Sequence, residues 1–220
     1  MQVQLSQIDV QPGHKVTLRN ISWDDFEQIL AELGDRRASR IAYYQGILEI
    51  MVPLAGHEDG KEITGDLIKV ILEELDIEFR SLGSTTFKRQ VMNAGVEPDA
   101  CFYIQNEAAI RGKKRIDLNF DPPPDLAVEI DFTSDSEIKK NSYAALGIPE
   151  LWIYNGRSLK LYVLQERQYI ATEKSQIFPN LPLAEVIPQY VNRSKVEGRN
   201  RAIKAFRRWV AEYLGTKRDN

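Results

Sequence analysis

Apolar residues recur at helical spacing in four segments of the chain. The first begins after Ser22, a residue type that favours helix N-termini, and ends at Gly34. The longest covers residues 58–77 and carries a continuous apolar stripe, so we expect it to be the main core helix. Two more helices are expected at about residues 136–146 and at residues 199–214, and the last of these is amphipathic and basic.

Short runs rich in β-branched and aromatic residues predict strands between these helices. Residues 41–44 and 47–52 flank Gln45 and Gly46, a pattern typical of an antiparallel hairpin. Further runs predict strands at residues 87–92, 99–104, 125–132, 151–154, 159–164 and 169–172. The order of helix, hairpin, helix, strands, helix and strands predicts a mixed α/β layer architecture.

The chain has 220 residues, 43 % of them apolar, which is enough for one compact domain with a sizeable core. Cys101 is the single cysteine, so an intrachain disulfide and a multi-cysteine metal site are excluded and a reducing compartment is indicated. The sequence has neither the pattern of a signal peptide nor a run of about 18 apolar residues. We therefore expect a cytoplasmic protein without a membrane segment.

Charge is distributed unevenly along the chain. The formal net charge is −3, from 29 basic and 32 acidic residues, which excludes a uniformly basic nucleic-acid-binding surface. Residues 193–218 contain nine basic and two acidic residues, so this segment carries +7 and the remainder carries −10. We predict one domain over residues 1–192, followed by a basic C-terminal helix and tail over residues 193–220.

Carboxylates embedded in apolar strands are the strongest chemical signal. Asp99 opens one predicted strand, and Glu129 and Asp131 lie in another. Because side chains alternate along a strand, Glu129 and Asp131 face the same side, about 7 Å apart. If Asp99 lies on the adjacent strand, three negative charges converge, and such a cluster favours a bound cation or a protonated carboxyl. The alternative is a half-exposed strand whose acids face water.

An ordered series of short motifs extends this signal over most of the chain. Glu97-Pro98-Asp99 is followed by Glu129-Ile130-Asp131 and a basic helix. This series resembles the PD-(D/E)XK nuclease superfamily, and more closely its restriction endonuclease-like branch, which is abundant in cyanobacterial genomes. Further similar positions are Ser22-Trp23, residues 46–49, His57-Glu58, residues 83–86, residues 121–131 and Phe178-Pro179. The resemblance implies a mixed sheet flanked by helices, with an N-terminal helix and hairpin and a C-terminal amphipathic helix.

The resemblance also implies a metal site. It makes Asp99 and Glu129 ligands of Mg²⁺ or Mn²⁺, ions that favour oxygen donors, with the backbone carbonyl of Ile130 as a third ligand. It favours Glu58 as an N-terminal carboxylate, and Glu62, one turn later, is the alternative. Exposed helical glutamates are the other interpretation of both residues.

One position departs from the superfamily pattern. The superfamily's lysine normally stands two residues after the second acid, and that position is Asp131 here. We predict that Lys139, from the following helix, supplies the amine, with Lys140 as the alternative and a solvated surface pair as the other interpretation. Asp131 is then predicted to bind a second ion or to hold the lysine.

These residues predict a metal-dependent endonuclease that hydrolyses phosphodiester bonds of nucleic acid, with DNA as the expected substrate. Asp99, Glu129, Asp131 and Lys139 are the predicted catalytic residues. The alternative is a nuclease-like fold without catalysis, retained as a DNA-binding or dimerisation module.

The basic C-terminal helix is a predicted phosphate-binding element. Lys204, Arg207 and Arg208 are the residues expected to contact nucleic acid, with an affinity that falls as salt rises. The apolar face of the same helix can instead dock it on the domain or on a second subunit. We expect the chain to form a homodimer.

Overall fold

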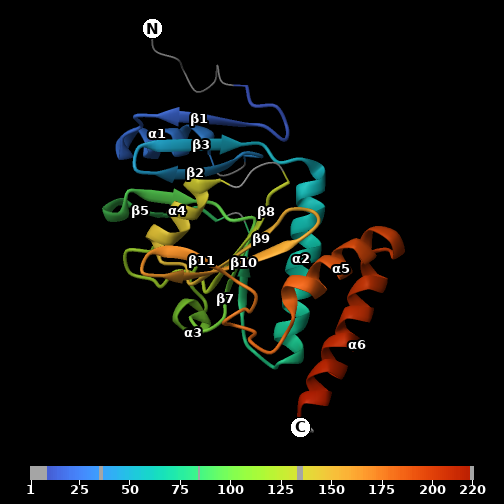
Figure 1. Cartoon of the computed structure of the whole chain (residues 1–220). Helices are drawn as coiled ribbons and strands as arrows, with labels where there is room; N and C mark the ends of the chain where they lie inside the picture. Colours follow the sequence, from blue (N-terminus) through green and yellow to red (C-terminus); the bar gives the residue numbers. More distant parts are fainter. Residues whose placement is uncertain (1–8, 35–36, 84, 133–135, 219–220) are drawn as a thin grey trace.

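The structure is a computed structural model that describes residues 9–34, 37–83, 85–132 and 136–218. It contains two sheets with helices around them (Figure 1). The first sheet consists of β1 (Lys15–Arg19), β3 (Ile47–Met51), β2 (Arg40–Tyr44), β6 (Ala94–Val96) and β5 (Phe87–Arg89), in that order. The second consists of β11 (Gln168–Thr172), β10 (Leu159–Gln165), β9 (Glu150–Tyr154), β8 (Leu126–Ile130), β7 (Ala100–Tyr103) and β4 (Arg80–Leu82), in that order.

The helices occupy defined places around the sheets. They are α1 (Trp23–Leu33), α2 (Ala55–Glu74), α3 (Glu107–Ile110), α4 (Glu137–Leu146), α5 (Leu183–Glu197) and α6 (Arg199–Arg218). The strand pairs are antiparallel except β8 with β9, which α4 connects as a crossover helix. None of the described helices is long and apolar enough to cross a membrane.

Strand β8 lies inside the second sheet, and all five of its residues are buried. Its alternate residues Leu126, Val128 and Ile130 pack with α2, α5 and α6 on one face of the sheet. Ala127, on the opposite face, packs with residues of α4 and of the first sheet. Glu129 therefore belongs to the face that α4 covers.

Local signals explain where α1 and α4 begin. The Ser22 side chain accepts the Asp25 N–H, and the Asp25 carboxylate accepts the Ser22 N–H, which together form a capping box. The Ser136 hydroxyl accepts the Lys139 N–H and caps α4, which ends at Gly147 in the left-handed conformation. The sequence-predicted positions of both helices are confirmed.

The mixed α/β architecture predicted from the sequence is confirmed, with differences at particular elements. The predicted strand at residues 87–92 ends at Arg89, because residues 90–92 form a 3₁₀ turn before Asn93, which has a left-handed φ of 48°. Strands β1, β4 and β6 and helices α3 and α5 were not predicted. Helix α5 was missed because its start has no side-chain cap and because it contains Pro188, a residue that usually ends a helix. The helix continues through the expected boundary between residues 192 and 193.

Gly95 permits the close contact between α1 and the first sheet. A Cβ atom at Gly95 would lie 2.7 Å from Cζ of Phe26, which is fully buried. We expect Gly95→Ala to lower the free energy of unfolding in urea by about 1–3 kcal/mol, because the ring has no space to retreat. Gly65→Ala in α2 is the control, since beyond its chain neighbours and the backbone of its own helix no atom lies within 4 Å of the added Cβ. The control should be neutral or gain up to about 1 kcal/mol, and equal losses in both variants would contradict this account.

Candidate active site

Two buried carboxylates lie side by side where β7 begins and β8 ends. Asp99 directly precedes β7, and Ala100 pairs with Val128, so the next antiparallel position brings Asp99 opposite Glu129. The two residues are 3 % and 2 % exposed. The Asp99 carboxylate accepts the backbone N–H of Ile130 at 2.8 Å. Glu129 therefore does not face water, and the half-exposed-strand interpretation is wrong for this residue.

Helix α4 brings a lysine to this pair. The Lys139 amine donates to Glu129 Oε2 at 2.6 Å, and its side chain is 12 % exposed. Tyr143, one turn later, donates its hydroxyl to Glu129 Oε1. Lys140 instead lies over the ring of Tyr162, with Nζ 4.7 Å from the ring centroid. Of the two candidate lysines, the structure therefore places Lys139 against the carboxylates.

Burial controls the protonation of this group. It raises the pKa of Glu129 to about 7, and the nearby charge of Asp99 adds to this effect, while Lys139 and Tyr143 oppose it. Burial also disfavours the charged form of Lys139, but the carboxylates of Glu129 and Asp99 outweigh it and raise the pKa of the amine. Near neutral pH the amine is therefore charged while Glu129 exchanges a proton.

The first sheet holds the start of α4 in place. The Ser136 hydroxyl donates to Glu49 Oε2 at 2.6 Å, while its oxygen accepts the Lys139 N–H at 3.2 Å. Lys15 of β1 donates to Glu49 Oε1 at 3.1 Å. Sequence reasoning included Glu49 in the similar segment of residues 46–49 but gave it no role, although it is an acid within an apolar strand, the same signal that singled out Asp99 and Glu129. It also missed that Ser136, as the N-cap of α4, sets the position of Lys139.

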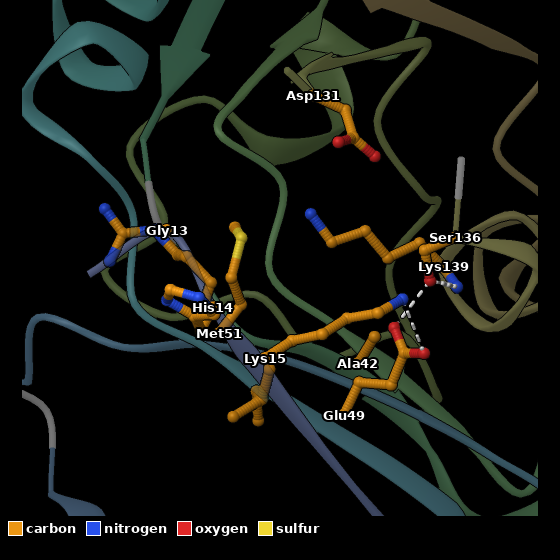
Figure 2. A pocket seen from close by; sticks show the side chains of 11 residues that line it. Gly13, His14, Lys15, Ala42, Glu49, Met51, Asp131, Ser136 and Lys139 are labelled. Carbon is orange, nitrogen blue, oxygen red and sulfur yellow. Dashed lines mark hydrogen bonds and ion pairs between the residues drawn. The ribbon is translucent and has the colours of Figure 1, made fainter. Parts of the chain in front are cut away.

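An open pocket of about 390 Å³ lies beside these residues. Its polar lining consists of His14, Lys15, Arg40, Glu49, Asp131, Ser136 and Lys139. Figure 2 shows the Lys139 amine extending into the pocket between Asp131 on one side and the paired Lys15 and Glu49 on the other. The lining thus combines three permanent cations with two carboxylates, next to the buried Glu129. Asp131, which sequence reasoning grouped with Asp99 and Glu129, follows the buried Glu129 by two residues and lines the pocket.

Comparisons with known proteins agree on the family and the fold. The family described as "Putative restriction endonuclease", Uma2, matches residues 23–194. The chain belongs to the Uma2 family. A crystal structure of a "putative nuclease" of the DUF820 family from Anabaena variabilis has the same fold, with a TM-score of 0.52 at 17 % identity, and the similarity covers 78 % of this chain and 99 % of that one. No curated protein matches the chain. The restriction endonuclease-like resemblance is therefore confirmed.

The Uma2 match covers the whole acidic group and α4, but it does not include β1 or α6. The N-terminal part of α2 lies within it. Glu58, on this helix, has a 42 % exposed side chain and pairs with Arg40 at 3.3 Å and Lys61 at 2.5 Å. Glu62 is 67 % exposed and lies 3.8 Å from Lys61. The structure therefore connects Glu58, rather than Glu62, with Arg40 of the pocket.

His57 of this Uma2 chain is buried next to the acidic group. It is 2 % exposed, its Nδ1 accepts the Leu54 N–H at 3.2 Å, and its ring centroid lies 4.6 Å from that of Phe132. Burial lowers the pKa of the imidazole, although the charges of Asp99 and Asp131 act in the opposite direction. Sequence reasoning included His57 only in the similar segment His57-Glu58 and gave it no role.

Helix α6 docks on the domain. Phe206 and Val210 are buried against α2 and α5, and the Arg207 guanidinium pairs with Glu73 at 2.6 Å and Glu74 at 2.7 Å. Of the predicted phosphate-binding residues, Lys204 and Arg208 are exposed and Arg207 is engaged in docking. The helix packs on α2 and α5, which cover the sheet face opposite to the one that α4 covers (Figure 1). The docking interpretation therefore holds for the apolar face and for Arg207.

The donor set of this Uma2 site suits a small, partly hydrated cation. Among the described residues no group of three or more His, Cys, Asp or Glu side chains is arranged to hold a metal ion by protein ligands alone. Mg²⁺ usually takes one or two carboxylates and keeps several waters or substrate oxygens. Asp99 and Glu129 provide such a pair, and burial, which raises the pKa of Glu129, disfavours the charged carboxylate that a bound cation would stabilise.

The raised pKa of Glu129 is directly measurable. In the metal-free protein we expect the side-chain ¹³C resonance of Glu129 to titrate with a midpoint near pH 7. Because the folded pKa exceeds the ordinary value of 4.5, this group contributes stability below pH 4.5, which is lost as pH rises to about 7. Glu129→Gln identifies the resonance by removing it. A midpoint below pH 5 would contradict the assignment.

The role of Ser136 can be separated from ordinary helix capping. We expect Ser136→Ala and Ser22→Ala each to lower the free energy of unfolding by about 1 kcal/mol, because each removes an N-cap. Only Ser136→Ala should also shift the ¹⁵N resonance of the Lys139 amine, since it releases the start of α4 from Glu49. An unchanged Lys139 resonance in Ser136→Ala would show that Glu49 does not position this helix.

Proposed function

We propose that this chain is a Mg²⁺- or Mn²⁺-dependent endonuclease that hydrolyses phosphodiester bonds of nucleic acid, with DNA as its substrate. The observation that carries the proposal is the Lys139 amine 2.6 Å from Glu129, beside the buried carboxylate of Asp99. The superfamily's usual lysine position is Asp131 in this chain, and α4 offers the missing amine. Membership of a family described as restriction endonucleases supports the same function.

The proposal gives each residue of the group a role. Asp99 and Glu129 would hold the cation, with the Ile130 carbonyl as a third ligand and Glu58 reaching it through water. A divalent ion bound there activates a water molecule and stabilises the negative charge that develops on the phosphate. Lys139 remains charged and has further N–H donors besides the one on Glu129, so it can orient a phosphoryl oxygen or the attacking water.

Two other residues refine this arrangement. Tyr143 fixes one Glu129 oxygen by its hydrogen bond, which leaves the carboxylate a single orientation. Asp131 lines the pocket together with Lys139, so it is placed to hold the amine or a second ion. Cys101 has no part in this arrangement. Its thiol is buried, and burial raises its pKa to about 12, so it is not a nucleophile near neutral pH.

The substrate must approach a chain whose body is acidic. Lys15, Arg40 and Lys139 line the pocket, where their remaining N–H donors can bind phosphate oxygens. Each of them also pairs with a carboxylate, of Glu49, Glu58 and Glu129 respectively, so a phosphate must share these cations with the acids. Lys204 and Arg208 on α6 offer further exposed cations on another face of the molecule, while the charge of Arg207 is offset by two glutamates. We propose that the pocket contacts the phosphates next to the bond that is cleaved, and that α6 contacts phosphates farther along the nucleic acid.

Cleavage assays with matched lysine variants test the function. We expect the purified protein to cleave single-stranded, duplex or branched DNA in Mg²⁺ or Mn²⁺. Lys139→Met should lower the rate by about 10²-fold or more, because a charged donor to the reacting group is removed. Lys140→Met is the control and should change the rate by less than about threefold, since this amine lies over Tyr162.

Two results would contradict the proposal. One is cleavage that is equal in the wild type and in Glu129→Gln, because the activity would then belong to a contaminant or to another site. The other is equal loss of activity in Lys139→Met and Lys140→Met. Circular dichroism and thermal unfolding of each variant show whether it is folded.

A further inference from the structure

His57 lies against the end of β8 that carries the acidic group. It is the third residue of α2, and its ring packs on Phe132, two residues beyond the last residue of β8. Gly60, one turn later in α2, allows this approach, because a Cβ atom there would lie only 3.1 Å from Cγ2 of Ile130. The ionic groups that act on the imidazole include Asp99, Asp131 and Lys139. The ring thus lies at the strand end that carries the proposed catalytic residues.

The hydrogen bond at one ring nitrogen determines the chemistry of the other. Nδ1 accepts the backbone N–H of Leu54 at 3.2 Å, so the neutral ring carries its proton on Nε2. Nε2 is buried and has no hydrogen-bond partner among the described residues. A buried donor without a partner destabilises the fold, and buried polar groups in folded proteins are nearly always paired.

We propose that His57 is a positioning residue whose Nε2–H holds a buried water molecule at the end of β8 that carries the acidic group. A water molecule matches this donor, because it accepts the Nε2–H through its oxygen and keeps two hydrogens to donate to acceptors around it. The role deepens the proposed nuclease function and rests on it: His57 orients a water at the strand end that carries the carboxylates proposed to hold the cation. The water contact itself can be tested without metal or substrate.

Two other roles for His57 disagree with the geometry. Direct metal ligation requires a lone pair on Nε2, but the Leu54 contact leaves the proton on that nitrogen. Direct contact with a substrate requires an accessible atom, but Nε2 is buried and the residue is 2 % exposed. A buried water molecule agrees with both observations, because it can accept the Nε2–H and needs no access from the surface.

Nuclear magnetic resonance of the metal-free, ¹⁵N-histidine-labelled protein tests the water contact. We expect long-range ¹H–¹⁵N spectra to show His57 protonated at Nε2, and its Hε2 proton to give a cross-peak to water. The chain has two histidines, so His14→Gln assigns the signals. A proton on Nδ1, or an Hε2 proton without a water cross-peak, would overturn the proposal.

Two variants separate positioning from a merely structural role. In His57→Asn the amide oxygen keeps an acceptor for the Leu54 N–H but no donor reaches the position of Nε2, whereas His57→Gln carries an amide N–H close to that position. We expect both variants to stay folded by circular dichroism, and we expect His57→Asn to lose at least about tenfold in Mg²⁺-dependent cleavage and several-fold in Mn²⁺ affinity measured by calorimetry. His57→Gln should recover part of both losses.

The possible outcomes are distinct. Equal behaviour of the Asn and Gln variants, or wild-type cleavage and affinity in His57→Asn, would overturn the positioning role. Absence of cleavage in the wild type would overturn the proposed nuclease function, and the metal-free resonance experiment would still decide whether His57 holds the water.

Discussion

The contact between the Lys139 amine and the Glu129 carboxylate is the interaction on which the site depends. Removing both charges from water costs several kcal/mol for each ion, and a well-packed apolar pair at the same place would often be at least as stable. The pair persists because Glu129 also accepts the Tyr143 hydroxyl and lies beside Asp99 in a fixed register. A buried charged group of this kind, with strongly shifted pKa values and an adjoining pocket, is typical of a functional site.

The architecture explains why the acid and the amine come from different elements. Helix α4 is the crossover between the parallel strands β8 and β9, so it must pack on the sheet face that Glu129 shares. Its start is fixed by the first sheet through Glu49 and Ser136. The pocket forms where the two sheets meet α4, and its cations Lys15 and Arg40 belong to the first sheet. The first sheet therefore supports the site and contributes to its charge.

Much of this site could be predicted from local patterns, and the remainder depends on long-range packing. Alternation along β8 predicted the shared face of the acids, and the family resemblance directed the search for a lysine to the helix after β8. Lys139 was predicted with Lys140 as the alternative, and the choice depends on which amine reaches Glu129, which only the packing of α4 shows. The contact of Glu49 with Ser136 joins residues 87 positions apart, so no local pattern indicates it. Similarly, a count of basic residues in α6 does not show that Glu73 and Glu74 offset Arg207.

The central claim is that the Asp99 and Glu129 carboxylates, with the Lys139 amine, form a cation-dependent hydrolytic site. The most direct test is a crystal structure of the protein soaked in Mn²⁺, with the ion located by its anomalous scattering. The account predicts one peak in contact with both carboxylates and the Lys139 amine within hydrogen-bond distance of the ion's water or phosphate ligands. A protein that binds no Mn²⁺ at these carboxylates, or binds it only elsewhere on the surface, would contradict the account.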